Sequence, residues 1–155
     1  MPIHFHYDPD VGILFTRAEG LLTLDEILRN LIEERNAGGV AYPEVTDATQ
    51  ARTDATAEQV RVIVQRMIDM HRQGAFGPTA VITTNDVVFG MASMLGILSE
   101  LRSGPKVQAF RTFSEGLDWL VRMKRDSRAR RKYPRPAPQQ RRQPRREPAQ
   151  SVATS

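Results

Sequence analysis

Apolar and polar residues alternate at the start of the chain and later recur at helical spacing, which predicts strands followed by helices. Residues 3–7 alternate as a half-buried strand does, and residues 8–10 are turn formers. A second strand starts with residues 13–16 and ends at Gly20. Apolar and β-branched runs predict three more strands, at 42–46, 80–83 and 107–110. We expect the first two strands to form an antiparallel hairpin.

Four helices are predicted between and after these strands. Thr23, Thr56 and Thr112 each precede Glu or Gln by three residues, as in a capping box, and Asn85 or Asp86 can cap the third helix. Residues 33–35 of the first helix are expected mostly on its solvent-exposed face. Its apolar residues recur at helical spacing and are Leu24, Ile27, Leu28, Leu31 and Ile32. The order ββαβαβαβα predicts an α/β fold with a mixed, mostly parallel five-stranded sheet and about four flanking helices.

Charge divides the chain into two parts. Residues 122–155 contain twelve Lys or Arg against Asp126 and Glu147, a net charge of +10, whereas the other residues contain ten Lys or Arg against sixteen Asp or Glu, a net charge of −6. Prolines and the loss of apolar positions prevent the tail from forming a core. We therefore predict an α/β domain at 1–121, a basic helical extension at 122–132 and a disordered Arg/Pro/Gln-rich tail at 133–155.

Composition narrows the function classes. The chain has no cysteine, so disulfides, thiolate metal sites and cysteine nucleophiles are excluded. The N-terminus lacks the pattern of a secretory signal, and no apolar stretch reaches the length of a membrane span. We expect a cytoplasmic protein.

Two segments resemble a known family. The sequences AEGLLTLDEILRNL (18–31) and VQAFRTFSEGLDWL (107–120) are similar to the SpoIIAA-like branch of the STAS domains, whose core is related to CRAL-TRIO domains. The resemblance covers about residues 3–121 and implies a bacterial, regulatory, protein-binding module that is not an enzyme. In anti-sigma factor antagonists an Asp-Ser-x-Gly segment opens the second helix and its serine is phosphorylated. The matching segment 54–57 has no serine or glycine, and Thr56 fits a helix cap better than a phosphate acceptor.

The carboxyl ends of parallel strands are the usual place for a ligand or partner in such a sheet. Here that edge corresponds to two loops, at 47–56 and 83–86, which we expect to be neighbours. Their hydroxyls, carboxylates and helix N-termini can hold an anion or a carbonyl, or can act only as caps and turn formers. The candidate residues are Asp47, Thr53, Asp54, Thr56, Thr84, Asn85 and Asp86.

Catalytic and metal chemistry have little support in the sequence. His4 and His6 share one face of a strand, but neither His71 nor a cysteine supplies an evident third ligand. Asp47 and Asp54 have no accompanying nucleophile or phosphate loop. We expect no enzyme activity, no metal and no cofactor.

The predicted third helix is apolar nearly all round between residues 87 and 98, which exceeds what one buried face requires. Two explanations are open. Val87, Met94 and Ile97 can pack under the fourth helix, or the small residues Gly90, Ala92, Ser93 and Gly96 can admit a partner helix, as in a homodimer. Val87, Gly90, Met94 and Ile97 are the candidate interface.

The leading hypothesis from the sequence is a non-enzymatic STAS-like regulatory or protein-interaction module with a protein partner or a homodimeric state. An alternative is a non-specific, salt-sensitive binder of nucleic acid or an anionic surface. This binding would use tail residues Arg128, Arg130, Arg131, Lys132, Arg141, Arg142, Arg145 and Arg146. A second alternative is a small-ligand carrier that uses the strand-end loops.

Overall fold

A five-stranded sheet forms the centre of the structure, and its strands lie side by side in chain order. The computed structural model describes residues 3–132. Strand β1 (Ile3–Asp8) pairs antiparallel with β2 (Ile13–Leu22). The other neighbours are parallel: β2 with β3 (Glu44–Thr53), β3 with β4 (Thr79–Ile82) and β4 with β5 (Val107–Phe110). The predicted hairpin and mostly parallel sheet are confirmed.

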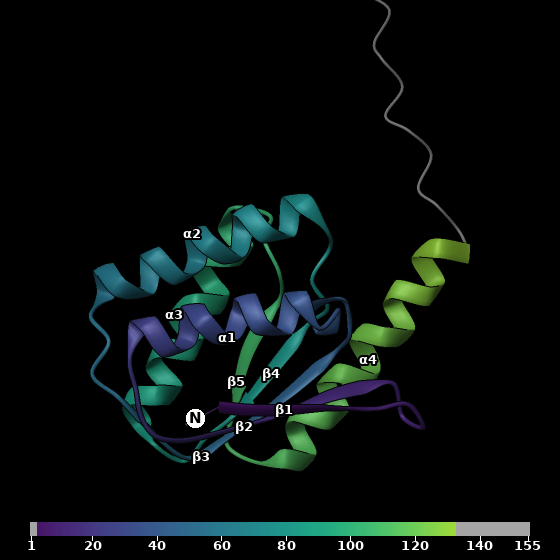
Figure 1. The fold of residues 1–155 in the computed structure, drawn as a ribbon. Helices are drawn as coiled ribbons and strands as arrows, with labels where there is room; N and C mark the ends of the chain where they lie inside the picture. The colour runs from purple at the N-terminus through teal and green to yellow at the C-terminus, as the bar shows by residue number, and fades with distance from the viewer. Residues whose placement is uncertain (1–2, 133–155) are drawn as a thin grey trace, which may run out of the picture.

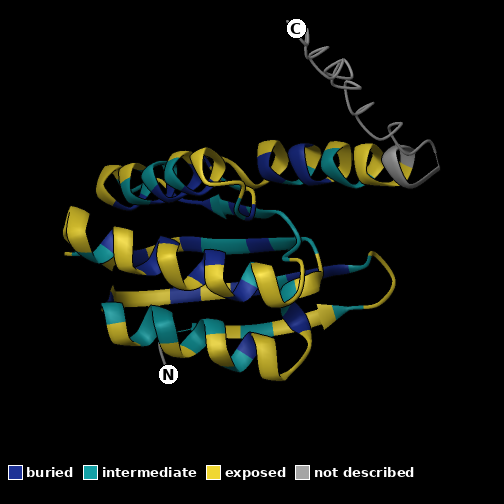
Figure 2. Cartoon of the chain, turned by 90° about the horizontal axis from the view of Figure 1, so that it is seen from above, coloured by how far each residue is buried: buried dark blue, intermediate teal, exposed yellow. Residues whose placement is uncertain are grey.

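Helices cover both faces of this sheet (Figure 1). Helices α1 (Leu24–Asn36) and α3 (Asp86–Leu101) pack on one face, and α2 (Ala57–Gln73) lies against both of them. Helix α4 (Phe113–Lys132) packs against β3, β4 and β5 on the opposite face. A short 3-10 helix, η1 (Gly39–Ala41), follows α1. Figure 2 shows buried residues on the inward sides of the helices and exposed residues outside, as expected for amphipathic helices.

The predicted caps are present. The side chains of Thr23 and Thr56 each accept a hydrogen bond from the backbone NH three residues later. In turn, the side chains of Glu26 and Gln59 accept a hydrogen bond from the backbone NH of the capping threonine. Asn85, rather than Asp86, caps α3. Each cap satisfies NH groups that the first helical turn leaves without a partner, so short polar signals set the helix starts.

The core consists of one apolar cluster on the α4 side of the sheet and two on the other side. Phe110, Trp119 and Leu120 join β5 to α4, with Ile13 and Val45 beneath them. On the other side, apolar residues of α1, α2 and α3 pack together, and a small cluster of alanines from β2 and β3 receives the start of α3. The three clusters hold α1, α2, α3 and α4 against the sheet or a neighbouring helix.

Strands β2 and β3 are longer than predicted. The segment from Asp47 to Thr53 was expected to be loop but is strand, and β2 continues through Gly20 to Leu22. Arg17 pairs with Asp47, whereas Glu19 pairs with Gln50, so β3 carries one extra residue at a bulge. The bulge breaks the two-residue alternation by which a strand is recognised, and this explains why the sequence pattern failed here.

The first helix is rotated relative to the prediction. Glu34, expected mostly on the solvent-exposed face, is only 2% exposed, whereas Ile32, assigned to the apolar face, is exposed. Glu34 follows Ile27 by seven residues and Leu31 by three, so it lies on their face of the helix. A carboxyl group therefore enters the interior.

Helix α4 continues past the predicted domain boundary at residue 121. Met123 packs against the cluster around Trp119, and the Nζ atom of Lys124 donates to the carbonyl of Val11, 3.1 Å away, in the β1–β2 turn. These two residues of the predicted basic extension are thus attached to the domain. None of the helices within residues 3–132 combines the length and apolar character needed to cross a membrane.

Candidate functional site

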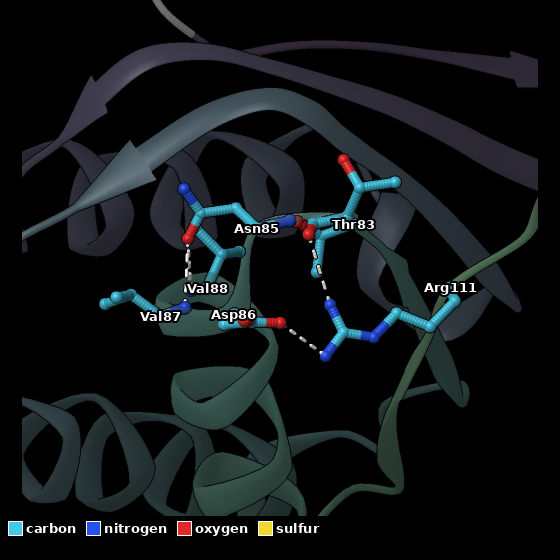
Figure 3. Close-up of polar contacts among 7 residues, drawn as sticks. Thr83, Asn85, Asp86, Val87, Val88 and Arg111 are labelled. Atoms are coloured by element: carbon cyan, nitrogen blue, oxygen red, sulfur yellow. Dashed lines mark hydrogen bonds and ion pairs between the residues drawn. The ribbon is translucent and has the colours of Figure 1, made fainter.

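Residues at the carboxyl ends of β4 and β5 form a hydrogen-bonded cluster (Figure 3). The Oδ1 atom of Asn85 accepts from the NH groups of Val87 and Val88, at 3.0 and 3.1 Å. Arg111, which follows β5, donates to the carbonyl of Thr84 and forms an ion pair of 2.8 Å with Asp86. Its guanidinium also lies 4.0 Å from the ring centroid of Phe89. Arg111 was not singled out from the sequence, and it fixes this loop to the end of the sheet.

These polar groups are largely engaged with one another. The Asn85 side chain accepts hydrogen bonds from the backbone NH groups that an anion would use at the start of α3. At the start of α2, the Thr56 hydroxyl likewise accepts from the backbone NH of Gln59. Thr53 donates to the carbonyl of Leu22 and accepts from the NH of Ala55. Thr53, Thr56 and Asn85 thus serve as caps and turn formers, which was one of the two expectations, whereas Asp54 and Thr84 are exposed.

The two strand-end loops were expected to be neighbours, but their polar groups are not linked. Within the described chain, no hydrogen bond or ion pair joins residues 53–56 to residues 83–86. The reason is the length of β3, which continues six residues beyond Asp47, the partner of Ile82 in β4. At about 3.3 Å per residue, β3 thus extends by roughly 20 Å of strand beyond the residue that pairs with the end of β4.

Asp47 belongs to a different surface from the other candidates. Its side chain accepts from the NH and hydroxyl of Thr49, and it lines a hollow on the α4 side of the sheet with His4, His6 and Arg17. His6 also stacks on Phe15. In the part of the chain that the structure describes, no three His, Asp or Glu side chains are grouped as metal ligands.

The candidate interface on α3 is largely exposed. Val87 and Ile97 are 60% and 62% exposed and Gly90 is also at the surface, while Met94 is partly buried. Leu101, one turn after Ile97, is 76% exposed. Packing under α4, one of the two explanations offered above, is wrong because α4 covers the opposite face of the sheet.

The small residues of α3 have separate roles. A Cβ added at Gly96 would lie 2.1 Å from the carbonyl oxygen of Val107, so Gly96 allows α3 to approach β5. Ala92 is likewise buried. A Cβ at Gly90 would meet nothing within 4 Å. Of these three residues, Gly90 alone is on the exposed side.

A cavity of about 140 Å³ lies between the sheet and helices α1, α2 and α3. Its walls are mostly apolar, with Ile63 and Met67 from α2 and Met91 and Leu95 from α3 among them. Its polar end is formed by two glutamates and their neighbours; these residues are Thr16, Asn30, Glu34, Glu44, Thr46 and Thr79. No Lys, Arg or His side chain belongs to the described lining.

Burial raises the pKa of both carboxyl groups at the polar end of the cavity. Burial, and then the neighbouring charge of Glu44, raise the pKa of Glu34 to about 8, although Asn30 donates a 2.6 Å hydrogen bond to it. Burial likewise raises the pKa of Glu44, and hydrogen bonds from the hydroxyls of Thr16, Thr46 and Thr79 partly offset that effect. Two acidic groups therefore face one apolar space without a cation.

Sequence reasoning missed this cavity because it searched the carboxyl ends of the strands. Glu44 and Thr79 are the first residues of β3 and β4, so the polar end lies at the amino edge of the parallel strands. The available signal was the position of Glu34 on the apolar face of α1. Of the predicted tail residues, Arg128 is exposed on α4, and the side chains of the other seven lie outside the described residues.

Comparison with known proteins finds similarity at the level of structure. One solved structure is an uncharacterized protein of the DUF3478 family from Shewanella loihica PV-4, described as having a SpoIIAA-like fold. It is 17% identical, covers 76% of this chain and 91% of its own, and gives a TM-score of 0.45. The anti-sigma factor antagonist SpoIIAA in its unphosphorylated form is 11% identical, with coverages of 77% and 97% and a TM-score of 0.43.

No family model matches the chain, and no curated protein matches it. The fold class given above stands on the strand order and register of this chain.

Proposed function

We propose that this chain is a non-enzymatic regulatory module that acts by protein–protein interaction, and that the first partner on its α3 face is a second copy of the chain. The observation that supports this most strongly is the exposed apolar stripe of α3, formed by Val87, Gly90, Met94, Ile97 and Leu101. Its spacings alternate between three and four residues, the pattern by which one helix packs along another. A stripe of this kind on a helix already anchored to the sheet favours a docking surface.

The stripe is complementary to itself in an antiparallel arrangement. With a twofold axis at Met94, Val87 lies seven residues before the axis and Leu101 seven after it, so each meets the other across the pair. Gly90 lies four residues before the axis and Ile97 three after it, so the side chain of Ile97 enters the space left by Gly90. Large and small residues thus alternate across the contact.

Charge supports the same arrangement. Asp86 lies eight residues before Met94 and Arg102 eight after it, so an antiparallel pair brings opposite charges together at both ends. The Asp86 side chain is largely exposed despite its ion pair with Arg111. Rim charges of this kind set the register of an interface more than its affinity.

The alternatives have less support in the described chain. An enzyme or carrier at the strand ends would need free polar groups, but Thr56 and Asn85 cap α2 and α3, and Asp86 pairs with Arg111. Binding of nucleic acid or an anionic surface through the tail stays a prediction from charge. The domain boundaries at 121 and 132 are likewise proposed, with Met123 and Lys124 assigned to the folded part because of their contacts.

Sedimentation of the full chain tests the proposal. We expect a concentration-dependent change from monomer to dimer between about 5 and 500 µM, because association follows mass action. Ile97→Glu should weaken this association by at least about tenfold, since it introduces an unpaired charge at the centre of the contact.

Val62→Glu is the matched control. Val62 is an exposed apolar residue on α2, outside the stripe, and its replacement should leave the association unchanged. A chain that stays monomeric throughout, or an equal effect of the two substitutions, contradicts the proposal.

A further inference from the structure

The cavity between the sheet and helices α1 to α3 combines features of a ligand site that the proposed interaction on α3 does not use. Its apolar walls enclose about 140 Å³, close to the volume in which a six-carbon ring such as benzene can be held by a protein. Its polar groups are confined to one end. Such a division suits a ligand with an apolar body and one polar group.

The charge at the polar end defines what that polar group should be. Glu34 and Glu44 interact electrostatically, and the described lining supplies no cation to either. Asn30 donates a hydrogen bond to Glu34, and Thr46 and Thr79 donate to Glu44, but none of these donors carries a charge. A positive charge brought by a ligand would let both carboxyls ionise.

An unpaired acceptor lies at the same place. The Asn30 side chain donates to Glu34, but its Oδ1 atom has no hydrogen-bond partner among the described residues. Thr16 is only 4% exposed and lines the cavity, its hydroxyl lowers the pKa of Glu44 as a hydrogen-bond donor, and its Oγ1 atom can accept a further hydrogen bond. A buried acceptor without a donor is destabilising. The missing group is therefore a donor.

We propose that this cavity binds a small apolar amine, with its ammonium group at Glu34 and Glu44 and its hydrocarbon body among the apolar side chains. An ammonium has three donors, so it can serve both carboxyls and the unpaired amide oxygen of Asn30. Glu44 and Phe76 are partly exposed, which gives the polar end of the cavity access to solvent. This site is independent of the proposed α3 contact.

Cyclohexylamine and its neutral counterpart cyclohexanol are suitable probes for the full chain, because they share a ring and differ in charge. In a titration followed by NMR at about pH 8.5, the amine should bind at least about tenfold more tightly than the alcohol. At about pH 6 this preference should fall about tenfold, because protonated Glu34 attracts the cation less.

Glu34→Gln keeps the shape of the side chain and removes its charge. We expect this variant to bind cyclohexylamine at least about tenfold more weakly than the parent chain while cyclohexanol changes less than about threefold. Glu33→Gln, on the same helix and outside the cavity lining, should change neither. Equal binding of the two probes, no binding of the amine, or unchanged amine binding by Glu34→Gln would overturn the proposal.

Discussion

Glu34 shows how one residue can depart from the pattern around it. Its spacing from Ile27 and Leu31 places it on the buried face of α1, although its charge suggests the surface. The prediction followed the chemistry of the side chain rather than its helical position. Burial is tolerated because Asn30 donates to the carboxyl and because its raised pKa lets it carry a proton near neutral pH.

This protonation makes stability depend on pH. Glu34 titrates at about 8 in the folded chain against an ordinary value of 4.5, so its protonated form favours folding below pH 4.5 and that contribution is lost as pH rises through 8. Glu34→Gln does not titrate. Relative to the parent chain, its free energy of unfolding should therefore be similar at pH 4.5 and higher by a few kcal/mol above pH 8, since one pKa unit corresponds to about 1.4 kcal/mol.

Denaturant unfolding at several pH values measures this difference. Glu33→Gln is the control, because Glu33 neighbours Glu34 in the chain and lies outside the cavity lining. Parallel stability profiles for the parent chain and Glu34→Gln would show that Glu34 titrates normally.

At the scale of elements, the caps were predictable and the strand lengths were not. Thr23, Thr56 and Asn85 act on amides two or three residues away, so a short sequence contains the whole signal. The second half of β3 depends on its pairing with β2 across a bulge, which is a contact between distant residues. Ala48 and Ala51 both face the core although they are three residues apart, so alternation could not reveal that strand.

Two glycines of α3 provide a matched test of its two faces. Gly90→Ala should stabilise the chain by about 0.5–1 kcal/mol, because the added methyl group meets nothing and alanine favours a helix. Gly96→Ala should destabilise it by about 1–3 kcal/mol, because the methyl group would overlap the carbonyl of Val107. Thermal unfolding at low protein concentration measures both; a loss of stability in Gly90→Ala would show that its side of α3 is covered within one chain.

For the molecule as a whole, the order of elements was predictable because each strand and helix carries its own periodicity. The position of the cavity was not, since it depends on how α1 and α3 rest on the sheet and on which strand edge Glu44 occupies. The exposed stripe of α3 was partly visible as an excess of apolar residues. Only the placement of α4 on the opposite face excluded packing of that stripe under α4.

The proposed pairing of two copies of the chain along α3 can be tested with a single cysteine at the centre of that helix. The chain has no cysteine of its own, so Met94→Cys introduces a unique reporter at the proposed twofold axis. A disulfide requires Cα atoms within about 4–7 Å, which is reached where the two helices cross. Under mild oxidation, Met94→Cys should form a covalent dimer at least about tenfold faster than Val62→Cys on α2, because only the former holds its thiols together. Equal rates for the two variants would contradict the account.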